Sequence, residues 1–189
     1  MQSIYERTLV TNKKTFSFSH ATHEVIESVI KSLNNKVSCP IYSIPPNMFK
    51  ENIDIFAIKL YNDFNRIVDE SIFPNNCKLA DITPAHKKYS KMEKVNYRPV
   101  SILPAMAKIF ERLLFNQLVI FFEDKLSTLQ CGFRKGYSTQ HCLIVMLEKW
   151  KHAIDKGNSA AALISDLSKA FDCLDHNLMI AKLHAYGCD

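Results

Sequence analysis

The chain has 189 residues, the length of one domain or a little more. Hydrophobic residues make up 47% and aromatic residues 11%, which is more apolar side chain than an intrinsically disordered chain carries. No run approaches the roughly 20 apolar residues that span a bilayer. All four glycines follow residue 130, so the first two thirds of the chain cannot hold the glycine-rich loop of a P-loop or dinucleotide-binding fold.

Positive charge is concentrated in one segment. The net charge is +5, and the 21 residues from Lys78 to Arg98 contain six basic and two acidic side chains, which leaves +4 of that charge there. Such a segment favours a polyanionic partner without requiring one. A solvated loop is the alternative interpretation.

The six cysteines are scattered and form no Cys-x-x-Cys pair, which argues against a zinc ribbon or a redox motif. The N-terminal residues contain no apolar signal-peptide core. Reduced thiols inside the cell are the simplest interpretation. We therefore expect a nuclear or cytoplasmic protein.

The first third predicts two helices. Residues 1–20 are polar and are expected to form an arm or linker end. Apolar residues at helical spacing predict a helix over 22–33, with Thr22 as its N-cap. Prolines make 39–46 irregular. A longer amphipathic helix is expected over 53–68.

The basic segment predicts a β-hairpin. Residues 78–84 form one expected strand and residues 97–103 its antiparallel partner. A lysine-rich loop joins them. We therefore expect a protruding basic hairpin.

Two strong helices, a strand and a shorter helix are predicted in the remainder. The strong helices are expected over 104–122 and 139–155, with a proline at the start of the first. The run at 160–165 is almost wholly apolar, as in a strand that is covered on both faces. An amphipathic helix over 177–186 closes the chain.

Asp166 follows the apolar run directly. A carboxylate at the end of a buried strand is costly unless it is solvated, paired or bound to metal. It could simply begin a turn. The functional alternative is a ligand of Mg²⁺, which prefers oxygen donors and commonly keeps substrate phosphates in its shell.

The residues around Asp166 resemble a motif of a known protein family. Residues 165–176 read SDLSKAFDCLDH and closely resemble the first catalytic motif of reverse transcriptases from non-long-terminal-repeat retrotransposons, the LINE and jockey-like group. Further segments similar to the family's motifs follow the family's order, and the resemblance covers about residues 16–189. These segments are 96–104 with 108–111, 130–139, and 182–183 with Gly187.

The resemblance implies an incomplete right-hand polymerase of the α+β class. Its parts would be helical fingers with a basic β-hairpin, followed by the first strand and helix of the palm. The corresponding boundaries are 1–20 for an arm, 21–76 for an N-terminal helical extension of the fingers, 77–157 for the fingers and 158–189 for the start of the palm.

The resemblance also implies roles for individual residues. It assigns Asp166 and the Leu167 carbonyl to catalytic Mg²⁺, and it puts Phe171 beneath the sugar of the incoming nucleotide, where a flat ring leaves no room for a 2′-hydroxyl. Basic side chains would contact the nucleotide, from Lys108 and Arg134, or the template, from Arg98, Lys87 and Lys88.

Each role has a plainer alternative. Phe171 could be a core aromatic, Arg98 could close the hairpin and Lys108 could be a solvated helix charge. Asp172 and Asp175 are better suited to cap the last helix than to catalyse. A Cys173–His176 nucleophile pair is a rival enzymatic interpretation, although nothing in the sequence orients it.

The implied activity is RNA-templated DNA synthesis. The expected partners are an RNA template, a DNA primer and deoxynucleoside triphosphates, and no membrane is expected among them. Two Mg²⁺ ions would need more carboxylates than Asp166, and no adjacent Asp-Asp pair occurs in this sequence. We therefore expect this chain alone not to polymerise, unless a longer product supplies further palm and thumb segments. The alternatives are a non-catalytic nucleic-acid-binding remnant and a pseudogene product that does not fold stably.

Overall fold

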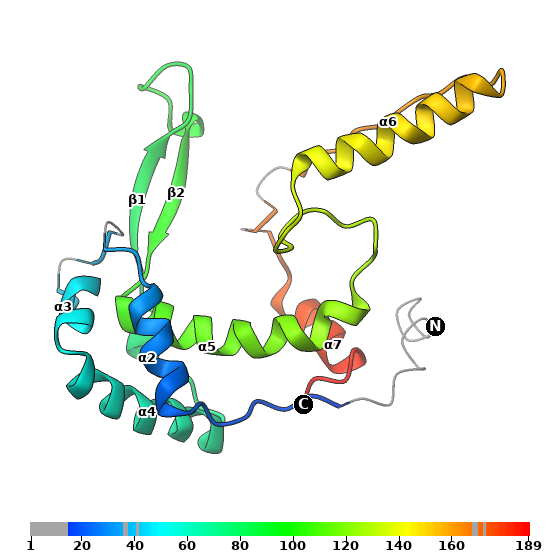
Figure 1. Ribbon diagram of the computed structural model, residues 1–189. Helices are drawn as coiled ribbons and strands as arrows, with labels where there is room; N and C mark the ends of the chain where they lie inside the picture. The colour runs from blue at the N-terminus through cyan, green and yellow to red at the C-terminus, as the bar shows by residue number, and fades with distance from the viewer. Residues whose placement is uncertain (1–14, 36–37, 41, 168–169, 172) are drawn as a thin grey trace. The chain divides into compact units, whose positions relative to one another are not determined.

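The computed structural model describes residues 15–35, 38–40, 42–167, 170–171 and 173–189. They form two compact units, one of residues 17–120 and one of residues 121–189 with residues 15–16. The helices and strands, shown in Figure 1, are α2 (His23–Ser32), α3 (Pro46–Glu51), α4 (Ile53–Glu70), β1 (Asp81–His86), β2 (Tyr97–Ile102), α5 (Ala105–Phe122), α6 (Thr139–Asp155) and α7 (His176–Ala185).

The first unit is held together by the apolar faces of α2, α4 and α5. Phe64 of α4 and Phe110 of α5 are fully buried, with ring centroids 6.2 Å apart. Burying each such side chain contributes about 1.5–3 kcal/mol. The other buried members of this cluster include Ile26, Val29, Ile30, Leu60, Ile67, Ile109 and Leu113.

The three predicted helices of this unit are confirmed. Thr22 is the N-cap of α2, and its hydroxyl accepts a hydrogen bond from the Val25 backbone N–H at 3.4 Å. The short helix α3 was not predicted. Pro46 begins it at a position where the missing N–H costs nothing, and Phe49 anchors it in the core.

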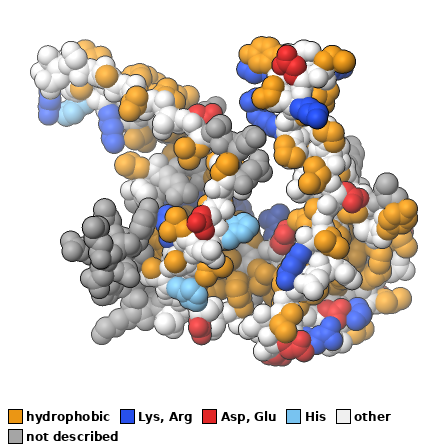
Figure 2. Space-filling view, turned by 180° about the vertical axis from the view of Figure 1, so that it is seen from behind, with side chains coloured by type: hydrophobic (Ala, Val, Ile, Leu, Met, Phe, Trp, Pro, Cys, Tyr) orange, Lys and Arg blue, Asp and Glu red, His pale blue; other side chains and the backbone are white. Residues whose placement is uncertain are grey.

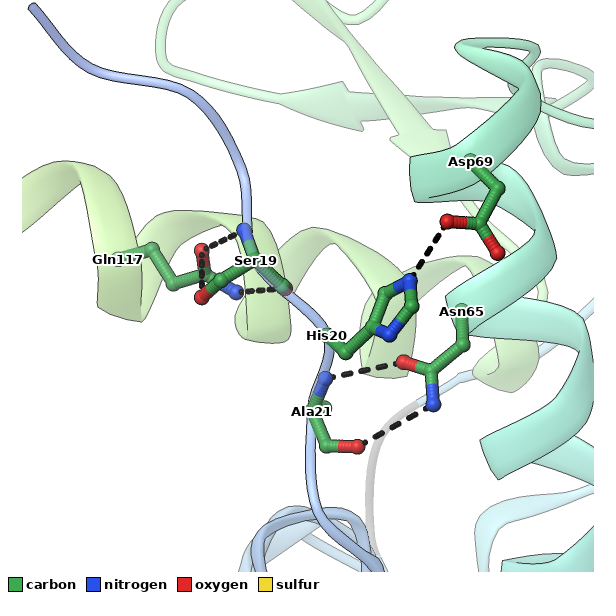
Figure 3. Close-up of polar contacts among 6 residues, drawn as sticks. All are labelled: Ser19, His20, Ala21, Asn65, Asp69 and Gln117. Atoms are coloured by element: carbon green, nitrogen blue, oxygen red, sulfur yellow. Dashed lines mark hydrogen bonds and ion pairs between the residues drawn. The ribbon is translucent and has the colours of Figure 1, made fainter.

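A short N-terminal segment is hydrogen-bonded to α4 and α5 (Figure 3). The buried amide of Asn65 accepts from the Ala21 backbone N–H at 3.0 Å and donates to the Ala21 carbonyl at 3.4 Å. Gln117 of α5 bonds the Ser19 backbone in the same two-way manner, with both distances 2.9 Å. His20 lies 2.7 Å from Asp69. Two side-chain amides thus satisfy the backbone N–H and C=O groups of Ser19 and Ala21, as a neighbouring strand would. Residues 1–14 of the predicted arm lie outside the described residues.

The predicted hairpin is confirmed. Strands β1 and β2 pair antiparallel from Asp81↔Ile102 to His86↔Tyr97. Figure 1 shows them projecting from the helices of their unit. The β1 residues are all exposed, and Tyr97 and Ile102 of β2 are only partly covered. The hairpin therefore rests on its own hydrogen bonds and offers both faces to a partner.

The second unit contains α6 and α7. Phe16 forms a parallel bridge with Cys188, and Phe122 packs against Tyr186 with ring centroids 5.6 Å apart. Asp175 is the N-cap of α7 and accepts from the backbone N–H groups of Asn177 and Leu178, as expected; Asp172 lies outside the described residues.

Helix α6 forms as predicted, but its apolar stripe is not buried. Leu143, Leu147 and Ile154 are each at least half exposed, and Figure 2 shows hydrophobic side chains along the surface. The predicted helix is confirmed, and its apolar stripe lies exposed in the described chain.

The strand predicted at 160–165 does not form. These residues have no strand assignment and are exposed, with Leu163 98% accessible. The physical reason is that a central strand needs hydrogen-bonded neighbours, and β1 and β2, which make up the sheet of the described residues, pair with each other. No helix in the described part of the chain is long and apolar enough to cross a membrane.

Candidate nucleic-acid interface

The hairpin presents a group of uncompensated positive charges. Arg98 stands on β2 opposite Ala85, and Lys87 and Lys88 follow β1 directly. All three are exposed, and none of them forms an ion pair with a described carboxylate. Free cations on a protruding element can contact a phosphate backbone without reading its sequence.

Lys108 lies on α5 beside a cavity of about 460 Å³. Its ammonium donates to the Ser38 carbonyl at 3.0 Å, a contact across 70 residues of sequence. Glu111 lines the same cavity, and partial loss of water around its carboxyl raises its pKa, against the opposing attraction of Lys108. Lys108 therefore fixes a loop in this structure, and its predicted nucleotide contact stays a prediction.

Arg134 closes the loop that precedes α6. Its guanidinium donates to Glu123 at 2.5 Å and to the Ser127 carbonyl at 3.2 Å, and it lies 4.6 Å from the centre of the Tyr137 ring. The hydrogen bond to Glu123 raises the pKa of the Arg134 side chain further. Only 10% of this side chain is accessible, although its Nε atom has no hydrogen-bond partner in the described chain.

Phe171 contacts an aromatic ring that the sequence did not single out. Phe133 and Phe171 meet edge to face with centroids 6.2 Å apart, and both are more than 80% exposed. Phe171 is thus not the core aromatic of the plainer alternative. The structure brings it near the segment that contains Arg134 and leaves its ring open to a ligand.

Asp166 and Leu167 are exposed and lie in chain without regular secondary structure. No hydrogen bond joins the Asp166 carboxylate to a described residue. Cys173 and His176, the rival pair, likewise share no hydrogen bond within the described residues.

The comparisons with known proteins decide the family. Residues 86–189 match the family model described as "Reverse transcriptase (RNA-dependent DNA polymerase)". That segment is more than half of the chain. The chain belongs to the reverse transcriptase family.

The similar proteins include polymerases of transposons and mobile elements. The chain is similar to the "Probable RNA-directed DNA polymerase from transposon X-element" of Drosophila melanogaster, 34% identical over 158 residues, which is 81% of this chain and 17% of that protein. It is 31% identical to the transposon BS polymerase of the same organism, over 85% of this chain and 18% of that protein. It is also 31% identical to the RNA-directed DNA polymerase from mobile element jockey of Drosophila melanogaster, over 63% of this chain and 13% of that protein. The chain spans less than a fifth of the length of these relatives.

Reverse transcriptases use divalent metal ions, which need several oxygen ligands. Asp166 with the Leu167 carbonyl could offer two oxygen ligands, whereas Mg²⁺ takes near-octahedral coordination. The described part of the chain has no group of three His, Cys, Asp or Glu side chains that could hold a metal ion. The described residues therefore do not by themselves fit a complete metal centre.

The sequence did not predict the contacts that Arg134 and Lys108 make in the structure. Glu123 and Tyr137 flank Arg134 at distances of 11 and three residues along the chain. The nearby aromatic residues in the segment 130–139 were the available signal, since arginine stacks readily on aromatic rings. The link from Lys108 to Ser38 left no local signal.

Proposed function

We propose that this chain supplies the template-gripping part of an RNA-directed DNA polymerase from a mobile element. The relatives are named as such polymerases. The observation that carries the proposal is the group of exposed cations on the hairpin, which have no described carboxylate partner. Such charges bind nucleic acid through phosphate contacts that release counterions.

The chain would contain two subdomains of a right-hand polymerase. Residues 21–157 would form the fingers with their N-terminal helical extension, and residues 158–189 would begin the palm. The protein would act inside the cell. Within a complete enzyme, Asp166 would be one of several carboxylates at the site of nucleotide transfer. Phe171 would lie against the sugar of the incoming deoxynucleotide, and its exposed ring supports that role.

The proposal is tested by the salt dependence of RNA binding. Fluorescence anisotropy with a labelled single-stranded RNA is expected to give an affinity that falls steeply with salt. The double variant Lys87→Gln/Lys88→Gln should bind more weakly, and the slope of log K against log salt should decrease by about 1.4, from roughly 0.7 per phosphate contact on a single strand.

Lys59→Gln, which removes one charge where the double variant removes two, is a control at a lysine outside the hairpin. Lys59 is an exposed lysine of α4 that pairs with Asp63, so its loss changes the net charge without touching the hairpin. Salt-insensitive binding, or equal effects of the control and the double variant, would contradict the proposed interface.

A second candidate is a nucleic-acid-binding module without catalysis. It rests on the segment from Lys78 to Arg98, which carries +4 of the net charge of +5 and needs no catalytic group to bind a phosphate backbone. A primer-extension assay with Mg²⁺ tests whether this chain alone catalyses nucleotide addition. We expect no extension by this chain alone; extension that disappears in Asp166→Ala would overturn that expectation.

A further inference from the structure

The end of the hairpin contains a backbone conformation that its sequence does not favour. Tyr89 has a φ of 68°, in the left-handed region, which bulky residues seldom adopt. The described chain has two other non-glycine residues with positive φ, Ser71 and Phe133. Such a conformation persists only where the surroundings enforce it, and these sites often serve a function.

Side chains at the ends of the two strands, and Asn96 just before β2, hold this conformation. His86 Nε2 lies 3.1 Å from the Tyr89 carbonyl and can donate to it. The Asn96 amide donates to the Ser90 carbonyl at 2.8 Å, and the Tyr97 hydroxyl donates to the Lys91 carbonyl at 2.9 Å. Three consecutive carbonyls of the connecting loop are therefore held, so the tip is preorganised.

The fixed loop displays apolar groups among cations. Tyr89 is 73% exposed and Met92 is 92% exposed. The Lys88 ammonium lies 4.8 Å from the centre of the Tyr89 ring. Figure 2 shows hydrophobic and basic side chains together at the end of the hairpin. A groove of about 510 Å³ continues from Met92 to Lys91, Lys94 and Tyr97.

We propose that this tip is a base-stacking site for single-stranded nucleic acid, with Tyr89 as its platform. An unpaired base would stack on the Tyr89 ring, and Lys88 and Lys91 would contact the adjoining phosphates. Aromatic rings interleaved with lysines are the chemistry that binds single strands without sequence preference. A duplex suits the site less well, because its bases already stack on one another. This inference rests on the proposed function. It adds that the bound nucleic acid is single-stranded and that the Tyr89 ring contacts its base.

The test uses a variant that removes the ring without straining the fold. Tyr89→Gly suits the positive φ, since glycine adopts it freely, so its melting temperature should not fall. Its affinity for a single strand of about ten nucleotides should drop about 5- to 150-fold, the range for loss of one stacked base. The salt slope should not change, because no charge is lost.

Two matched variants and several ligands complete the design. Tyr89→Phe keeps the ring and should bind as the parent chain does, and Tyr42→Ala removes another fully exposed tyrosine and should also have no effect. Single-stranded RNA and single-stranded DNA are measured separately, and the arm that shows the loss identifies the strand. Duplex RNA should bind Tyr89→Gly and the parent equally.

The outcomes separate the two proposals. Steep salt dependence with unchanged affinity in Tyr89→Gly overturns the stacking site alone. Equal losses in Tyr89→Gly and Tyr42→Ala, equal losses on duplex and single strand, or a loss with a smaller salt slope would also overturn it. A parent chain that shows no salt-dependent binding overturns the proposed function as well.

Discussion

The buried amide of Asn65 satisfies both backbone groups of Ala21 on the surface of α4. We expect Asn65→Ala to destabilise the first unit by about 1–3 kcal/mol, because it leaves a buried N–H and C=O without partners. Urea denaturation measures the change. Asn47→Ala, at an exposed position of α3, is the control, and equal effects of the two substitutions would refute the role assigned to Asn65.

The stability of the folded chain should depend slightly on pH through Glu111. Partial desolvation raises its pKa in the folded chain, so its contribution to stability is fully present below the unfolded pKa of about 4.3 and is lost as pH rises through the higher folded value. Glu111→Gln should therefore raise the melting temperature slightly at pH 7 and have little effect near pH 4. The change should be small because the side chain is exposed. A larger gain at acidic pH would contradict this sign.

Helices α4 and α6 differ in what their leucines contact. Leu60 of α4 is 1% exposed and belongs to the core, whereas Leu147 of α6 is 56% exposed. Leu60→Ala should cost about 2–5 kcal/mol, and Leu147→Ala should stay within about 0.5 kcal/mol of the parent chain. Thermal unfolding measures both. A large loss from Leu147→Ala would mean that α6 is covered in solution.

The sequence predicted elements well where their partners lie within one unit. The periodic stripes of α2, α4 and α5 meet in a common core, so their pattern and their burial agree. The hairpin was predictable because its two strands are close in sequence and pair with each other.

The expected strand at 160–165 and the stripe of α6 show what a local pattern cannot decide. An apolar run predicts burial only if a neighbouring strand or helix is present to cover it. The described residues provide no such cover, so Leu163 and Leu147 remain exposed.

The same limit applied to the candidate site. Motif resemblance led to Asp166, Phe171 and Arg134, but the contacts of Arg134 with Glu123 and of Phe171 with Phe133 depend on folding. Arg134 consequently closes a loop in this structure, and its role toward a nucleotide remains a prediction.

At the scale of the whole molecule, we propose that nucleic acid binds at the β1–β2 hairpin. The family supplies the chemistry of the partner, and the unpaired cations and fixed tip supply a place for it. A method that reports which residues contact the nucleic acid therefore tests this binding site most directly.

That measurement is ultraviolet crosslinking of a 4-thiouridine-labelled RNA to the intact chain, with crosslinked peptides mapped by mass spectrometry. The account predicts crosslinks concentrated between Lys87 and Arg98, diminished by high salt and by Lys87→Gln/Lys88→Gln. Crosslinks concentrated on α6 or α7, with the hairpin peptides unmodified, would contradict it.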